Sequence, residues 1–117
     1  MKPPRAALFA LFLSACVASQ GASVQRVDGV ALQVATDDGY YWPAPVPDPA
    51  SGTEIEVFPL VTALVVTRRD GLPMDRSAEA VARQAANAHC AGLGLGGPGA
   101  SARYANGAWA FFPCAGG

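Results

Sequence analysis

Lysine is the scarcest charged residue in this 117-residue chain, which contains only Lys2. Beyond residue 15 the only permanently basic side chains are six scattered arginines, which stand against nine acidic residues. Binding to nucleic acid needs clustered Lys and Arg to neutralise phosphates. We therefore expect no nucleic-acid partner, and no attraction of lysines to anionic lipid headgroups.

Groups suited to catalysis are also few. The only histidine is His89, and its neighbour in the sequence is Cys90, which is not the spacing of a zinc site. A Ser–His–acid triad would have to use His89, whereas a histidine near the end of a helix is favoured there by its charge alone. We expect no catalysis, no metal and no cofactor.

Long hydrophobic runs are missing as well. The longest run at the N-terminus covers residues 6–13, whereas a membrane-spanning helix needs about 20 apolar residues. Lys2 and Arg5 precede this run and small residues follow it, which is the order found in a signal peptide. We predict that residues 1–15 are a removed signal peptide. The alternative is that the run belongs to the core of the mature fold.

The motif Leu13-Ser14-Ala15-Cys16 resembles the lipobox of bacterial lipoproteins. The resemblance covers only the leader, and it implies that Cys16 receives diacylglycerol, that the chain is cut before it, and that the new amino group is acylated. Two or three acyl chains anchor a protein stably, whereas one holds it only marginally. Val17, by similarity to enterobacterial sorting, implies the outer membrane, facing the periplasm. A cut near Ala18 or Ala22 would instead leave a free periplasmic or secreted protein.

The three cysteines agree with a lipid on the first of them. If Cys16 is lipidated, Cys90 and Cys114 remain as an even pair in an oxidising compartment. We predict that they form one disulfide, which closes a loop of about 24 residues and contributes roughly 3 kcal/mol. The alternative is a pair of free thiols.

The remaining chain is long enough for one small domain. We predict a lipidated tether over residues 16–23 and a domain over residues 24–117. Alternating apolar residues predict a strand over 24–36, followed by a turn at Asp37-Asp38-Gly39. The β-branched run over 53–69 should break at Pro59, and its part over 62–68 is the expected central strand.

The second half of the chain predicts one helix and one hairpin. The helix should begin near Asp75 or Ser77, either of which can cap it, and should end at Gly92. Its expected buried face carries Val81, Ala85 and Ala88. Asn106-Gly107 predicts a tight hairpin turn. The resulting fold class is α+β, with one helix packed on a small antiparallel sheet and one disulfide.

An aromatic and proline-rich stretch, residues 40–49, is the candidate recognition feature. Proline at every second position excludes a helix and removes backbone donors, so we expect an extended and largely irregular loop. Tyr40, Tyr41 and Trp42 are candidate binding residues, because exposed aromatic rings stack on sugars or dock proteins. The alternative is that they fold back over the core.

The sequence as a whole predicts an exported protein with a lipid anchor in the cell envelope and a non-catalytic structural or interaction role. Its expected partners are the membrane, through the anchor, and an envelope protein or glycan. The alternative is a glycan- or peptide-binding module that uses residues 40–49.

Overall fold

The computed structural model describes residues 21–116, so the predicted signal peptide, the lipobox and Cys16 lie outside the described residues. The elements in chain order are β1 (Ala22–Val27), β2 (Val30–Tyr41), β3 (Ala44–Pro47), β4 (Glu54–Val57), β5 (Leu60–Arg68), α2 (Glu79–Gly92), β6 (Ala102–Ala105) and β7 (Ala108–Phe111). No helix within this part of the chain is long and apolar enough to cross a membrane.

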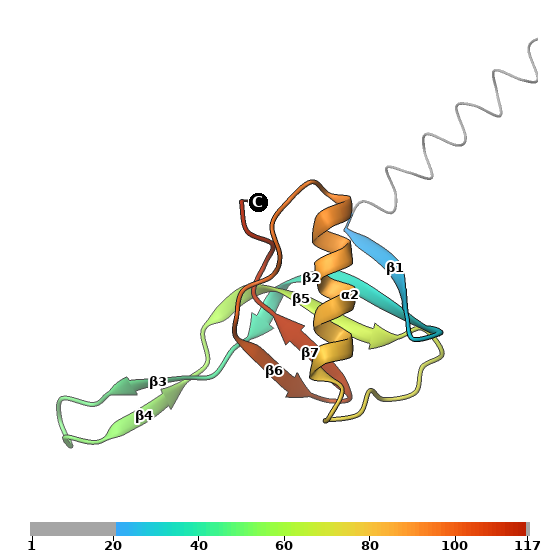
Figure 1. Cartoon of the computed structure of the whole chain (residues 1–117). Helices are drawn as coiled ribbons and strands as arrows, with labels where there is room; N and C mark the ends of the chain where they lie inside the picture. Colours follow the sequence, from blue (N-terminus) through green and yellow to red (C-terminus); the bar gives the residue numbers. More distant parts are fainter. Residues whose placement is uncertain (1–20, 117) are drawn as a thin grey trace, which may run out of the picture.

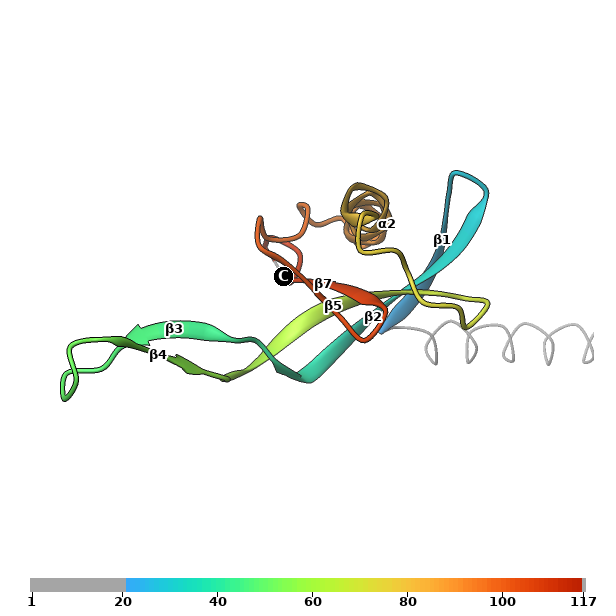
Figure 2. The same ribbon diagram turned by 90° about the horizontal axis from the view of Figure 1, so that it is seen from below.

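Five strands form an antiparallel sheet in the order β1-β2-β5-β7-β6, and α2 lies across one of its faces (Figures 1 and 2). Strands β3 and β4 form a separate two-stranded sheet. A disulfide joins Cys90, near the end of α2, to Cys114, after β7. The predicted α+β fold, the central position of β5 and the break at Pro59 are confirmed.

The core lies between α2 and the sheet. Its sheet side is made of large apolar residues and its helix side mostly of small ones, with His89 as the exception, so the helix can approach the strands closely. The fully buried large side chains are Phe111, Leu32, Val34 and Val66, and the buried helix residues are Ala82, Ala85, Ala86, His89 and Cys90. The predicted helix face was therefore displaced: Ala88 is exposed and Val81 only half-buried. Because alanine occupies most positions of the helix, the hydrophobic contrast between its faces is too weak to predict which face is buried.

Two tight turns organise the sheet. Asn106 and Gly107 both have positive φ, 54° and 74°, as a two-residue hairpin turn requires, and this prediction is confirmed. Asp28 and Gly29 adopt the same conformation, with φ of 52° and 79°. The single strand predicted over 24–36 is therefore wrong, because this turn divides it into β1 and β2.

Other predicted boundaries also shift. Residues 37–39 lie inside β2, at an irregularity where the register with β5 changes, and not at a turn. The helix begins at Glu79 after Ala78, with no side-chain cap, so neither Asp75 nor Ser77 caps it. Ala22 and Ser23, assigned above to the tether, pair with β2 as part of β1.

Candidate functional site

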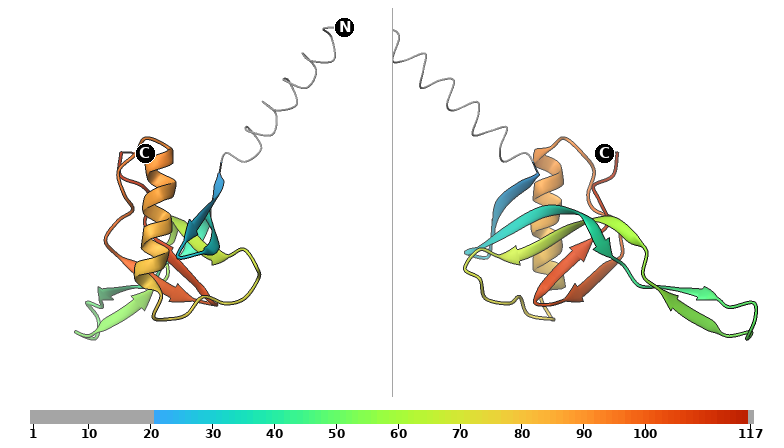
Figure 3. Two further views of the ribbon diagram at one scale, coloured as in Figure 1. Left: turned by 45° about the vertical axis from the view of Figure 1, so that its right-hand side comes forward. Right: turned by 180° about the vertical axis from the view of Figure 1, so that it is seen from behind.

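The residues predicted to form an irregular loop are part of a two-stranded hairpin, here called the β-arm (residues 42–60). Tyr40 pairs with Val61 at the end of the main sheet, and β3 and β4 continue the same register to the pair Pro47 and Glu54. Figures 2 and 3 show this hairpin projecting from the main sheet. The loop prediction for residues 40–49 is wrong, because the prolines are compatible with a strand.

The alternating prolines fit because of the direction in which each nitrogen points. Trp42 donates its backbone N–H to Pro59 O at 3.1 Å, and Asp48 donates to Thr53 O at 2.7 Å. In an antiparallel pair, inward-facing positions alternate with outward-facing ones. Because Trp42 and Asp48 face inward, Pro45 and Pro47 occupy outward-facing positions, where no hydrogen bond between β3 and β4 is lost. They leave the outer edge of β3 without donors.

The tip of the β-arm is closed by Asp48. Its Oδ1 accepts the Ala50 N–H at 3.0 Å, and its Oδ2 accepts the Ser51 hydroxyl at 2.8 Å. These hydrogen bonds, that of Ser51 above all, lower the pKa of the Asp48 carboxyl. The tip therefore carries a negative charge at neutral pH.

Aromatic rings gather at the base of the β-arm. Trp42 stacks on Phe112 with ring centroids 4.4 Å apart, and Tyr40 lies 5.9 Å from Trp42. The strand register places this cluster on the sheet face opposite α2, the face that also carries Ala63 and Ala110, both fully buried. Tyr40 and Trp42 are half-buried.

Tyr41, the last residue of β2, lies on the other face of the main sheet, so the three predicted binding residues do not form one surface. Its side chain is 61% exposed, and its cross-strand partner Leu60 is 59% exposed. Phe58, two residues before Leu60, is 53% exposed. These three residues form what we call the apolar patch. Sequence reasoning missed Phe58 and Leu60, although Pro59 between them marked an interruption of the strand.

His89 takes part in a polar chain that links α2 to β1. Its Nδ1 lies 2.6 Å from Ser23 Oγ, which also accepts a hydrogen bond from the Gln25 side chain at 2.9 Å. Only 5% of the His89 surface is exposed, and this burial lowers its pKa. No carboxylate within residues 21–116 hydrogen-bonds to His89.

Burial of His89 predicts a pH-dependent stability. The unfolded state binds a proton more readily than the folded one, so the free energy of unfolding should fall as pH drops from about 7.5 through the unfolded histidine pKa near 6.5. Urea unfolding at several pH values should show this decline in the wild type. The decline should be weaker in His89→Gln, and an identical slope in both proteins would contradict the prediction.

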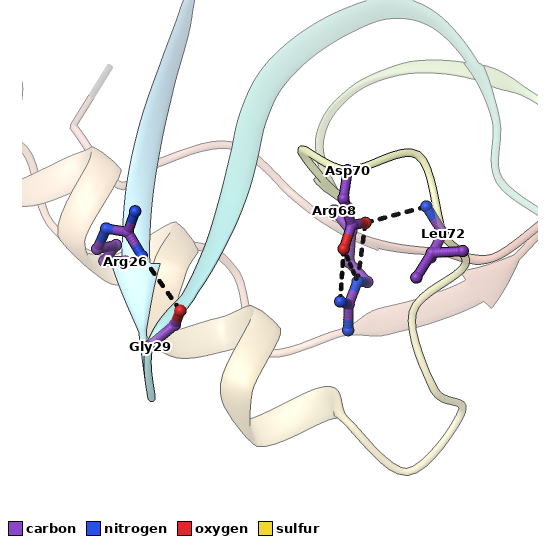
Figure 4. Close-up of polar contacts among 5 residues, drawn as sticks. All are labelled: Arg26, Gly29, Arg68, Asp70 and Leu72. Atoms are coloured by element: carbon purple, nitrogen blue, oxygen red, sulfur yellow. Dashed lines mark hydrogen bonds and ion pairs between the residues drawn. The ribbon is translucent and has the colours of Figure 1, made fainter.

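Among the surface pockets formed by residues 21–116, two accompany these features. One, of about 320 Å³, is lined by Arg68, Arg69 and the β1–β2 turn. Arg68 donates three hydrogen bonds to Asp70, at 2.6 to 3.2 Å, and lowers the pKa of that carboxyl to about 2 (Figure 4). Its guanidinium is thus already engaged. The other, of about 260 Å³, lies beside Tyr40, Tyr41 and Arg103. No metal-binding group of three acids, cysteines or histidines occurs within residues 21–116.

No protein-family model matches this chain, and neither a curated protein nor a solved structure is significantly similar to it. Its function must be inferred from its own residues.

Proposed function

We propose that this chain is an exported, lipid-anchored envelope protein with a non-catalytic interaction role, and that the β-arm makes the interaction. The observation that carries the proposal is the apolar patch of Tyr41, Phe58 and Leu60, which lies at the base of a hairpin that projects from the main sheet (Figure 3). Contiguous exposed apolar surface on a small protein typically marks an interaction site.

The position of β1 is compatible with an anchor at Cys16. Five residues separate Cys16 from Ala22, the first residue of β1, and such a segment spans at most about 20 Å. Strand β1 and the β-arm lie on opposite sides of the molecule (Figures 1 and 3). A domain tethered through β1 can therefore stay close to a membrane and still present the β-arm away from its point of attachment.

Among the alternatives for residues 40–49, the geometry favours a peptide over a glycan. Sugar stacking needs an open aromatic face, but one face of Trp42 is already occupied by Phe112. Tyr41 is well exposed, yet its neighbours are the aliphatic Leu60 and, beyond it, Phe58, which suit apolar side chains of a protein partner.

A photo-reactive amino acid at position 58, introduced into the full chain in its host, tests both parts of the proposal. After irradiation, the membrane fraction should contain one discrete cross-linked species. The uncross-linked protein should have the mass of residues 16–117 plus a diacylglyceryl group and, where the amino group is acylated, a third acyl chain, less two hydrogens for the disulfide. Exposed apolar residues on a projecting hairpin and an acylated Cys16 are the physical basis of these expectations.

Leu72 provides the matched control, because it is a 60% exposed apolar residue outside the β-arm. The same photo-reactive group at position 72 should give no such species. Equal cross-linking at both positions would contradict the interaction role of the β-arm. A mass beginning near Ser19 or Ser23 without acyl chains would contradict the anchor and leave a free periplasmic or secreted protein.

A further inference from the structure

We propose that the outer edge of β4 is the docking edge of the β-arm, and that it adds an extended peptide segment in which basic and apolar side chains alternate. This inference rests on the proposed interaction role and specifies its partner. The peptide would become a third, antiparallel strand beside β4, which has β3 as its only neighbour among the described strands.

The two edges of the β-arm differ in their capacity to pair. On β3 the outward-facing positions include Pro45 and Pro47, which have no N–H to offer. Their partners on β4 are Glu56 and Glu54, whose backbone N–H and C=O groups point outward by the same alternation. One edge is therefore blocked against strand addition and the other is open.

Side-chain alternation then defines the face that a partner would meet. Glu54, Glu56 and Phe58 follow one another on one face at period two, while Ile55 and Val57 point to the opposite face. A matching antiparallel strand has Lys or Arg opposite both glutamates. It has an apolar residue or Thr opposite Phe58, and apolar residues on its other face opposite the exposed Ile55 and the half-buried Val57.

The charge of the β-arm argues for a basic partner and against a second copy of the chain. Residues 42–60 contain the carboxylates of Asp48, Glu54 and Glu56 and no Lys, Arg or His. If two β4 edges paired antiparallel around a twofold axis at Ile55, each Glu54 would lie opposite a Glu56 of the other copy. Like charges placed directly opposite each other destabilise a strand pair.

The probe for this edge is the synthetic peptide Thr-Val-Thr-Val-Lys-Val-Lys, whose lysines fall opposite Glu56 and Glu54 in antiparallel register. Added to the full chain, it should slow hydrogen exchange at the outward amides of Glu54, Glu56 and Phe58. The inward amides of Ile55 and Val57 are already paired with β3 and should change little. The peptide Thr-Val-Thr-Val-Glu-Val-Glu should bind at least about tenfold more weakly, because it sets like charges opposite.

Substitutions at Glu56 distinguish the contribution of its backbone N–H to peptide binding from the contribution of its side-chain charge. Glu56→Pro removes one outward donor, as Pro45 does on β3, and should weaken binding of the lysine peptide about tenfold. Glu56→Gln keeps the donor and should weaken it about twofold. The double variant Glu54→Lys/Glu56→Lys should reverse the preference between the two peptides.

Three outcomes would overturn the inference: no binding of the lysine peptide, equal binding of both peptides, or equal affinity of the Gln and Pro variants. If the inward amides lost their protection in Glu56→Pro, the hairpin itself would be damaged, and the charge-reversed variant would then decide. A discrete cross-link at position 58 without peptide binding would leave the interaction role intact and place its partner in another class, such as a glycan.

Discussion

Replacing Phe111 by Ala should lower the free energy of unfolding by about 3–5 kcal/mol. Phe111 is fully buried in β7, opposite Leu64 of β5, and is the largest of the fully buried side chains. The helix side of this core is mostly alanine, and the long helix side chain that lies over the ring, Arg83, is charged, so no large apolar neighbour can move in to fill the space that the ring leaves. Because small domains are marginally stable, such a loss would be a large fraction of the total free energy of unfolding.

Phe112→Ala is the matched control, because the same side chain is removed one position further along. Phe112 is half-buried on the opposite face of the sheet, where it stacks on Trp42. Its loss should cost only about 1–2 kcal/mol, because solvent already reaches the site and the cavity term is small. Urea denaturation followed by far-UV circular dichroism gives both values. Equal losses would show that the two faces of the sheet contribute equally to the core.

Local signals in the sequence were sufficient for much of the fold. The β-branched run that became β5, the interruption at Pro59 and the turn at Asn106-Gly107 each depend on neighbours in the chain. The pair Cys90 and Cys114 followed from the number of cysteines. These features need no knowledge of strand pairing, and for that reason they could be predicted.

The features that depend on pairing were missed. Asp28-Gly29 carries the same turn signal as Asn106-Gly107, but the alternation around it was taken as one strand. Prolines in residues 40–49 appear incompatible with a sheet until the register shows that Pro45 and Pro47 face outward. A proline is tolerated or excluded according to the direction of its nitrogen, and only the partner strand sets that direction.

One irregularity in β2 separates Tyr41 from Tyr40 and Trp42, the other two predicted binding residues. Between Asp37 and Tyr40 the register of β2 against β5 shifts by one residue, so side chains beyond this point change faces. Without the shift, Tyr41 would lie with the aromatic cluster opposite α2. With it, Tyr40 and Trp42 join the cluster, and Tyr41 joins Leu60 on the exposed patch. Nothing in the residues 37–39 distinguishes such a shift from the turn that their composition favours.

Removing the disulfide through the double variant Cys90→Ala/Cys114→Ala should lower the free energy of unfolding by about 3 kcal/mol. The two cysteines are 24 residues apart, and the bond restricts the unfolded chain over this loop. In the folded state it holds the end of α2 to the segment after β7. The glycine-rich stretch between them is further tied by the Ala115 N–H, which donates to Gly97 O at 3.0 Å. Calorimetry should show a melting temperature lower by about 15 °C.

Chemical reduction of the wild type distinguishes the stability that the disulfide bond contributes from the stability that the buried cysteine side chains contribute. Both cysteines are at least nine-tenths buried, so truncation to alanine also removes apolar contacts, whereas reduction leaves the sulfurs in place. The reduced wild type should therefore lose somewhat less stability than the double variant, and both should fall well below the oxidised protein. If reduction left the melting temperature unchanged, the constraint on the unfolded chain would not be the source of the stability, and the hydrogen bonds along the glycine-rich stretch would have to hold the C-terminal segment alone.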